Sequence, residues 1–310
     1  MARFPVILGL DYGGSKVAAA VCDPAGNRLA TTVVDNRAED GAYACFQRGV
    51  AAGQELIARV SDDADPIAVG ACTFGIPFDD RVELAPTIPD WSGLAFGEEL
   101  RKAFPGLAVR LATDVKAAAM AELRWGALRG CDPGLYLNLG TGIAAAVVVN
   151  GAVISGRHGA AGEIAYNVRS ADEVGVPLAQ RISLEEVVSG KALARNATRV
   201  AGRPMRAAEV FAAASEDAVL AAVLDELVAE LCLHVTNLAI AVDAERIAVG
   251  GGMVRSWELL EPPLRRALDA AVPYPPELVV ARFPFDAPLV GALALGVAAA
   301  AEVIGVGATA

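Results

Sequence analysis

The feature that most constrains this chain is a strand–turn–strand pattern that occurs twice. In each copy, a short apolar run rich in β-branched residues stops at a glycine turn, and a second apolar run follows. The copies comprise residues 6–10, 11–15 and 16–22 in the first half, and residues 135–139, 140–142 and 143–149 in the second. Runs of this kind, bounded by turn residues, predict strands joined into hairpins. The repeat therefore predicts two related halves, each beginning with an antiparallel meander.

The residues around the two copies alternate between strand and helix patterns. We expect further strands at residues 28–34, 67–73, 108–112, 152–155 and 246–249. We expect helices at residues 42–60, 94–104, 114–128, 184–195, 207–214 and 218–241. Mixed strands and helices in two halves predict an α/β protein with a cleft between two lobes.

The composition is that of a chain with a large buried core. Hydrophobic residues make up 55% of the 310 residues, so extended disorder is not expected. The net charge of −11 argues against the basic surface that nucleic-acid binding requires. The most apolar stretch, residues 287–301, falls short of a membrane span and is expected to be a buried helix. The opening residues do not resemble a signal peptide, so we expect a cytoplasmic protein.

The cysteine pattern argues against a disulfide framework or a metal site. The five cysteines are Cys22, Cys45, Cys72, Cys131 and Cys232. They lie far apart in apolar surroundings, their number is odd, and none belongs to a C-x-x-C pair. We therefore expect reduced thiols in the core.

The first glycine turn carries groups suited to phosphate and Mg²⁺. Gly13 and Gly14 let backbone N–H groups approach an anion closely. Asp11 stands at the end of the strand and can hold Mg²⁺, directly or through water. Ser15 follows, and Lys16 adds positive charge. A plain hairpin turn is the alternative, and no G-x-x-x-x-G-K-[ST] sequence occurs, which excludes a Walker-type phosphate loop.

Two later glycine turns are also candidates for binding phosphate. The second copy of the pattern turns at Gly140-Thr141-Gly142. The run Gly250-Gly251-Gly252 follows the expected strand at residues 246–249. Consecutive glycines remove side chains where another group approaches the backbone. Structural turns are the alternative, but two such turns, one in each half, could hold a polyphosphate from both sides of a cleft.

Five segments, in this order, resemble the motifs of the ROK family (repressors, open reading frames and sugar kinases). They are LGLDYGGSK, GIPFDDRVELAPTIPDW, TDVKAAAMAE, LNLGTGIAAAVVVNGAVISGRHGAAGEIAY and IAVGGGM, and PLVGALALG matches the family's C-terminus. The resemblance implies an α/β, two-lobed actin-like (ribonuclease H-like) sugar-kinase fold with duplicated mixed β-sheet domains and an interlobe cleft. We expect one lobe to comprise residues 1–117 and 287–310, and the other residues 118–286.

The resemblance assigns chemistry to three acids. Asp114 matches the catalytic base, which accepts the proton of the attacking sugar hydroxyl. Glu163 and Glu185 match acids that accept hydrogen bonds from the sugar. The alternatives are a first-turn helix acid for Asp114 and solvated acids for the two glutamates. ATP and Mg²⁺ are the implied cofactors, with Asp11 as the expected Mg²⁺ ligand and the glycine turns as the phosphate site.

The chain departs from the family pattern around the sugar. Tyr166 stands where family kinases carry a His, and Lys116 and Thr87 stand where they carry Asn. Residues 167–183 contain no cysteine, whereas the family usually has a C-x-C-G-x-x-G-C zinc loop there. We therefore expect no zinc, and an acceptor such as an amino sugar (kanosamine) or a C7 cyclitol (a valiolone derivative). Lys116 has a second interpretation, in which it pairs with an acid and does not touch the ligand.

Other functional classes are open alternatives. A conventional glucokinase would tolerate these substitutions as neutral changes. A sugar-responsive regulator of the family would carry a helix-turn-helix domain before its first phosphate motif, which begins here near residue 8. His158 and His234, the two histidines, are expected in a loop and in the core. The family further implies a homodimer that binds a small sugar or cyclitol, without a nucleic-acid or membrane partner.

Overall fold

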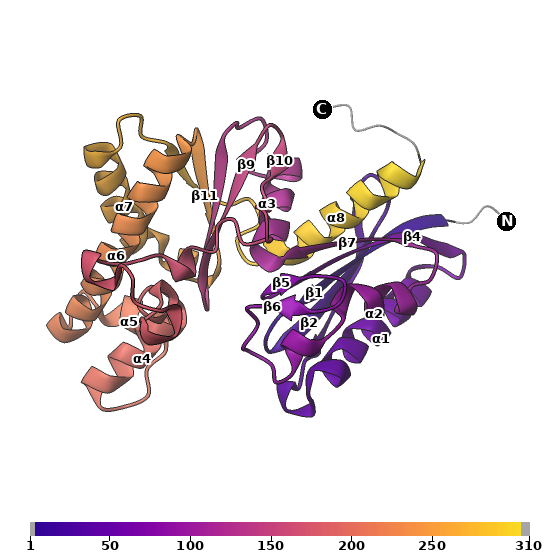
Figure 1. Ribbon diagram of the computed structural model, residues 1–310, viewed down its shortest axis with the longest axis horizontal. Coiled ribbons are helices and arrows are strands. Elements are labelled where there is room, and N and C mark those ends of the chain that lie inside the picture. The colour runs from indigo at the N-terminus through magenta and orange to yellow at the C-terminus, as the bar shows by residue number, and fades with distance from the viewer. Residues whose placement is uncertain (1–3, 305–310) are drawn as a thin grey trace. The chain divides into compact units, whose positions relative to one another are not determined.

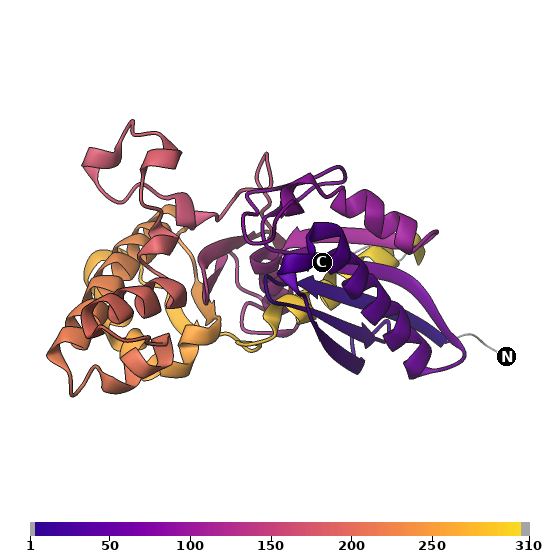
Figure 2. The same cartoon turned by 90° about the horizontal axis from the view of Figure 1, so that it is seen from below.

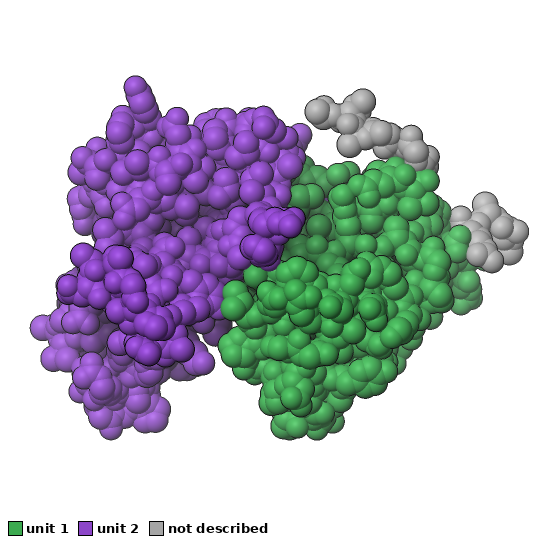
Figure 3. All heavy atoms as spheres, in the orientation of Figure 1, with its two compact units in different colours: residues 1–124, 286–310 green, residues 125–285 purple. Residues whose placement is uncertain are grey.

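The computed structural model describes residues 4–304 and consists of two compact units. Unit 1 comprises residues 1–124 and 286–310, and unit 2 comprises residues 125–285 (Figure 3). The boundary expected after residue 117 would cut through helix α3 (Asp114–Trp125), whereas this helix belongs to unit 1 as far as Arg124. The second boundary lies between Phe285 and Asp286, one residue before the expected position.

Unit 1 is built on a five-stranded sheet (Figure 1). Its strands are β1 (Phe4–Tyr12), β2 (Lys16–Cys22), β3 (Arg28–Asp35), β4 (Ala64–Thr73) and β7 (Ala108–Thr113). The order across the sheet is β3-β2-β1-β4-β7, with β1 to β3 antiparallel and with β4 and β7 parallel to β1. The remaining elements are α1 (Ala42–Val60), α2 (Phe96–Ala103), α3, α8 (Ala287–Ile304), the hairpin β5 (Ile76–Pro77) with β6 (Val82–Glu83), and the 3₁₀ turns η1 (Ala38–Asp40) and η2 (Trp91–Gly93).

Unit 2 repeats this topology. Its strands are β8 (Gly134–Leu139), β9 (Ile143–Val149), β10 (Ala152–Val153), β11 (Arg246–Gly250) and β12 (Glu277–Val280). The order β10-β9-β8-β11-β12 again combines an antiparallel meander with two parallel strands. The duplicated α/β architecture predicted from the repeated glycine turn is therefore confirmed. The helices are α4 (Gly190–Ala201), α5 (Ala207–Ala213), α6 (Ala218–Val242) and α7 (Trp257–Ala271), which gather on one face of this sheet (Figures 1 and 2).

The sheet of unit 1 is covered on both faces, which explains its continuous apolar strands. Alternate residues of a strand point to opposite faces, and Val6, Leu8 and Leu10 of β1 share one core with residues of α1. Ile7 and Gly9 point to the other face, where they meet α8. Figure 1 accordingly shows α1 and α8 on opposite sides of the sheet. The apolar stretch predicted to be a buried helix is α8.

Helix α8 lies almost directly on the backbone of its neighbours because a glycine, which has no side chain, lies at each contact. A Cβ at Gly70 of β4 would lie 1.9 Å from the carbonyl oxygen of Ala292. A Cβ at Gly291 of α8 would lie 1.8 Å from the carbonyl oxygen of Ala117 on α3. These separations leave no room for a side chain, so glycine permits the close packing of α3, α8 and the sheet.

The structure differs from the expected secondary structure most clearly at two helices. The helix expected at residues 184–195 exists, but it begins and ends later, because the chain forms a short 3₁₀ turn, η6 (Leu184–Glu186), before α4 begins. Ser189 caps α4 by accepting a hydrogen bond from the N–H of Ala192, so the chain is not helical just before Gly190. Helix α7 was not predicted, since it contains Pro262 and Pro263, which normally interrupt a helix.

The cysteines and the apolar helices agree with a packed interior. All five cysteines are free thiols; four are buried and Cys232 is half-buried. Within residues 4–304, no helix combines the length and apolar character needed to cross a membrane.

We predict that Gly291→Ala destabilises unit 1. In a helix interior this change normally stabilises the fold by about 0.5–1 kcal/mol, because alanine is the better helix former. At Gly291 the new methyl group would collide with the carbonyl oxygen of Ala117, and forced overpacking costs about 1–3 kcal/mol. Urea unfolding should therefore give a lower midpoint. Gly93→Ala is the control, because a Cβ there meets nothing within 4 Å, and its midpoint should match that of the wild type.

Candidate functional site

The first glycine turn joins β1 to β2 and is covered by a residue expected on the sugar side. The N–H of Gly13 donates to the carbonyl of Lys16 at 3.0 Å. A Cβ at Gly14 would lie 2.6 Å from Cγ2 of Thr87, so Thr87 packs directly on the turn. The predicted phosphate turn and Thr87 are therefore neighbours within unit 1.

Two acids of unit 1 lie at the carboxyl ends of parallel strands that are separated by one strand, β4. Asp11 of β1 is paired in register with Cys72 of β4, which is paired with Ala112 of β7. Asp114 follows directly after β7. The carboxyl ends of parallel strands are where ligands bind in open α/β sheets. The strand register thus brings the expected Mg²⁺ ligand and the expected catalytic base to one edge of the sheet.

Cys72 lies between these acids, and nothing in the sequence pattern pointed to it. Its Sγ lies 3.5 Å from Oδ1 of Asp11 and 3.4 Å from the carbonyl oxygen of Pro288. Burial raises the pKa of the Cys72 thiol well above its usual value, and the charges of Asp11 and Asp114 raise it further. The thiol therefore stays protonated and serves as a weak hydrogen-bond donor to Asp11.

Asp11 is half-buried, and its surroundings disfavour the carboxylate. Desolvation raises its pKa to about 6, against the lowering effects of the Cys72 hydrogen bond and the positive charge of Lys16. Hard carboxylate oxygens are the ligands that Mg²⁺ prefers. A cation beside Asp11 would favour its ionised form, so the chemistry of this residue fits a Mg²⁺ site.

Asp114 begins helix α3, but Thr113 supplies the helix cap. Oγ1 of Thr113 accepts the N–H of Lys116 at 3.2 Å, as an N-cap side chain does. Oδ1 of Asp114 accepts the adjacent N–H of Val115 at 2.8 Å, which is not the bond that an N-cap side chain makes. Capping therefore does not by itself account for an acid at this position. Lys116, expected near the sugar, is only 5% exposed on the same helix.

The second and third glycine turns meet within unit 2. The N–H of Gly140 donates to the carbonyl of Gly142 at 3.0 Å. Gly251 has φ = 94°, and a Cβ there would lie 2.4 Å from the carbonyl oxygen of Leu139. β8 and β11 are parallel neighbours, so both turns leave the sheet at the same edge. Two of the three predicted phosphate turns are thus adjacent, and Gly251 occupies a conformation that favours glycine.

Glu185 packs against the second glycine turn. A Cβ at Gly142 would lie 2.1 Å from Oε2 of Glu185, and the N–H of Ile143 donates to its carboxylate. Although the residue as a whole is exposed, desolvation of the packed carboxyl group raises its pKa, while Ile143 and Lys191 act in the opposite direction. The predicted sugar ligand therefore also contacts the predicted phosphate turn.

The other two predicted sugar ligands of unit 2 lie beside Glu185. Glu163 directly precedes the 3₁₀ turn η3 (Ile164–Tyr166), and the N–H of Tyr166 donates to its carbonyl at 3.2 Å. Burial raises the pKa of the Tyr166 phenol, and the charges of Glu163 and Glu185 raise it further. The structure therefore brings one phenol and two carboxylates together.

The cysteine-free segment after Tyr166 is tied to helix α6 by charged groups. Arg169 donates from Nη2 to Oε1 of Glu230 at 2.6 Å, and its N–H donates to Glu173 at 2.9 Å. Nδ2 of Asn167 lies 3.2 Å from Nδ1 of His234, which is buried as expected and whose pKa burial lowers. Across residues 4–304, no three His, Cys, Asp or Glu side chains are grouped in a way that could hold a metal ion.

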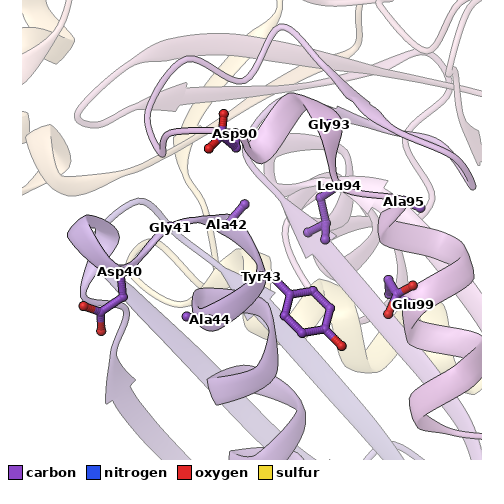
Figure 4. Close-up of a pocket in the computed structure, with 10 residues that line it drawn as sticks. All are labelled: Asp40, Gly41, Ala42, Tyr43, Ala44, Asp90, Gly93, Leu94, Ala95 and Glu99. Atoms are coloured by element: carbon purple, nitrogen blue, oxygen red, sulfur yellow. The ribbon is translucent and has the colours of Figure 1, made fainter.

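A shallow hollow lies at the start of α1 in unit 1. The residues that line it are Asp40, Gly41, Ala42, Tyr43, Ala44, Asp90, Gly93, Leu94, Ala95 and Glu99 (Figure 4). Three carboxylates border it, so it does not suit an anionic phosphate. His158, the other histidine, is exposed in a loop of unit 2, as expected.

The chain is similar to known proteins in both sequence and fold. A glucokinase of Thermotoga maritima is 29% identical over 285 residues, which cover 86% of this chain and 88% of the relative. A kanosamine kinase of Amycolatopsis mediterranei is 29% identical over 260 residues, 80% of each chain. The crystal structure of a ROK family glucokinase from Streptomyces griseus, in complex with glucose and AMPPNP, is 28% identical with a TM-score of 0.74, and the match covers 94% of this chain and 99% of that one.

Two sheets with one strand order, each ending in glycine turns at its carboxyl edge, define the actin-like sugar-kinase architecture. The chain belongs to the ROK family, whose model matches residues 7–299. The family resemblance carried by the five sequence segments is thereby confirmed.

We predict that Asp11→Asn stabilises the metal-free protein at pH 7. Because the folded-state pKa of Asp11 is raised to about 6, the native state holds a proton that the unfolded state has lost between about pH 4 and pH 6. Stability therefore falls as pH rises through this window. A two-unit shift corresponds to at most about 3 kcal/mol, and about 1–2 kcal/mol after allowance for partial exposure.

Thermal unfolding with a chelator present tests this expectation. Asp11→Asn should unfold at a higher temperature than the wild type at pH 7, and the difference should shrink at pH 4. Asp225→Asn, at an exposed position of α6, should show neither effect. A variant less stable than the wild type at pH 7 would mean that the Asp11 carboxylate is a net stabilising group.

Proposed function

We propose that the protein transfers the γ-phosphoryl group of ATP to a primary, C6-type hydroxyl of a sugar or sugar-like ring. Relatives named as glucokinases and a kanosamine kinase support a carbohydrate kinase. The relative crystallised with glucose and AMPPNP supports a sugar acceptor and an adenine nucleotide as donor. The observation that carries the proposal is the position of Asp11 and Asp114 at the same carboxyl edge of the sheet, on either side of β4, with a glycine turn directly after Asp11 and Tyr12.

In this proposal each residue of unit 1 has a distinct task. Backbone N–H groups of the turn at Gly13 and Gly14 donate to phosphate oxygens, and Lys16 adds positive charge. Asp11 offers a carboxylate to Mg²⁺, which, when bound, neutralises charge on the phosphates. Asp114 accepts the proton of the attacking hydroxyl. Phosphoryl transfer depends mainly on positioning and charge stabilisation, which these groups supply.

The residues of unit 2 hold the acceptor and the nucleotide. Glu163 and Glu185 accept hydrogen bonds from ring hydroxyls or an ammonium group, and the phenol of Tyr166 can donate or accept. The turns at Gly140-Thr141-Gly142 and Gly251-Gly252 offer further N–H groups to the nucleotide. The contact of Glu185 with Gly142 supports a coupling between acceptor binding and the phosphate turn.

We propose an amino sugar or a C7 cyclitol as the preferred acceptor. Two carboxylates beside a phenol form an acidic group that suits a cationic ammonium better than a neutral hydroxyl. Tyr166, Thr87 and Lys116 are the substitutions that set this chain apart from the family pattern. We also propose that residues 167–183 fold without zinc, held by the Arg169–Glu230 ion pair.

We predict that Asp114→Asn lowers kcat by about 10²–10⁴-fold, the usual cost of losing a general base. The fold and nucleotide affinity should not change, because Thr113 supplies the cap of α3. Coupled ADP release and calorimetry with ATP are the measurements. Asp217→Asn, at the N-cap of α6, is the matched control and should retain full turnover, since Asn caps helices as well as Asp. Near-normal turnover in Asp114→Asn would rule out its assignment as the base.

We predict that glucose is not the best acceptor. A site built around particular polar groups rejects the wrong ligand because buried groups are left unpaired. A comparison of kcat/KM for glucose, glucosamine, kanosamine, N-acetylmannosamine and a C7 cyclitol should favour an amino sugar or the cyclitol over glucose by about tenfold or more. Tyr166→His should narrow that gap. If glucose has the highest kcat/KM, the pocket is that of a conventional glucokinase.

A further inference from the structure

Asn36, directly after β3, is a buried polar residue that holds the first glycine turn. Its side chain is 0% exposed. Its Nδ2 donates to the carbonyl of Gly13 at 2.7 Å, and its backbone N–H donates to the carbonyl of Ser15 at 2.9 Å. One residue therefore fixes the two carbonyl groups on either side of Gly14.

Helix α1 holds Asn36 in turn. Nη1 of Arg48 donates to the carbonyl of Asn36 at 2.6 Å, and Sγ of Cys45 lies 3.1 Å from the same oxygen. Arg48 is itself paired with Asp40. A continuous chain of hydrogen bonds thus runs from α1 through Asn36 to the turn.

Because the carbonyls of Gly13 and Ser15 are held by Asn36, the N–H groups between them are kept in one orientation. Successive backbone N–H groups in a tight turn can form a concave site for an anion. Within residues 4–304, the N–H groups of Gly14 and Ser15 donate to no protein acceptor. These two donors are therefore available to a phosphate oxygen.

The side-chain amide of Asn36 has one buried atom, Oδ1, without a hydrogen-bond partner among the described residues. A buried acceptor without a partner is costly, and an apolar residue of the same shape would avoid that cost. The amide is oriented by the Gly13 carbonyl, which requires a donor. The amide at position 36 is therefore tied to the carbonyl of Gly13 and, through it, to the conformation of the glycine turn.

We propose that Asn36 is a positioning residue for the nucleotide phosphates, which acts through the carbonyls of Gly13 and Ser15. This inference rests on the proposed kinase function, because it takes the first glycine turn to be a phosphate site. Asn36 itself touches no substrate. Its task is to keep the N–H groups of Gly14 and Ser15 oriented before the nucleotide binds, which lowers the entropic cost of binding.

The test replaces the donor while keeping the size of the side chain. Asn36→Leu should raise KM for ATP about tenfold, which corresponds to about 1.4 kcal/mol, and should leave KM for the acceptor unchanged. Its melting temperature should fall by only about 2–4 °C, because the Gly13 carbonyl loses its donor while the unsatisfied Oδ1 is removed. Asn27→Leu is the matched control. Asn27 lies in the β2–β3 turn, where Nδ2 donates to Asp23 at 2.9 Å, and its KM for ATP should not change.

A second variant covers the possibility that Asn36→Leu folds poorly. Arg48→Met lies outside the turn and releases the carbonyl of Asn36, so it should raise KM for ATP about threefold, again without changing KM for the acceptor. Unchanged KM for ATP in a folded Asn36→Leu would overturn the proposal. So would equal changes in both KM values in Arg48→Met, which would indicate a purely structural role.

Calorimetry separates this inference from the proposed function. ATP affinity measured without any acceptor should fall in Asn36→Leu by the same factor as KM rises. If the wild type binds ATP but transfers no phosphate to any sugar, the proposed function fails while the role of Asn36 is still decided by affinity. If the wild type does not bind ATP, both fail together.

Discussion

The close contact between α8 and the strands of unit 1 is the constraint on which that unit depends. Helix α8 comes from the C-terminal end of the chain, yet it covers the face of β1 and β4 that α1 leaves open. Gly70 on β4 permits the close approach of Ala292 on α8, Gly291 on α8 permits that of Ala117 on α3, and β1 is the central strand of the sheet. The ends of β1, β4 and β7 are thereby fixed, and so are the residues that follow them.

Near the first glycine turn lie polar groups whose burial costs free energy. Asp11 has a raised pKa, Cys72 lies against its carboxyl group, and Oδ1 of Asn36 is unsatisfied. The desolvated Asp11 carboxyl group and the unsatisfied Oδ1 each lower the stability of unit 1, and the Cys72 thiol offsets only part of the first cost. All three residues lie at or beside the first glycine turn. Local rules are commonly broken at functional sites, where the requirement is to bind a ligand. The clustering of these costs supports a ligand site independently of any family resemblance.

Ion pairs and a hydrogen bond, rather than long helices or strands, hold the segment after Tyr166 in place. It is long, contains no cysteine, and includes only short 3₁₀ turns, η4 (Ala171–Glu173) and η5 (Leu178–Gln180). Partly buried ion pairs of Arg169 with Glu173 and Glu230 connect it to α6, and Arg181 donates to the carbonyl of Tyr166 at 3.5 Å. Such pairs are specific in geometry although their net contribution to stability is modest. They orient the turn that carries Tyr166.

The sequence by itself determined the duplicated topology and the residue types of the site. Strand runs, glycine turns and their repetition are local signals, and they predicted both meanders and the position of Asp114 after a strand. Only the tertiary structure decided which side chains meet: Cys72 beside Asp11, Glu185 against Gly142, and Arg169 with Glu230, 61 positions apart. For Asn36 both sources of information are needed. The register of β2 with β3 places Asn36 beside Ser15, whereas its side-chain hydrogen bond to Gly13 depends on packing. Local propensity sets where a strand begins and ends, whereas contacts between distant segments depend on register and on the space that packing leaves.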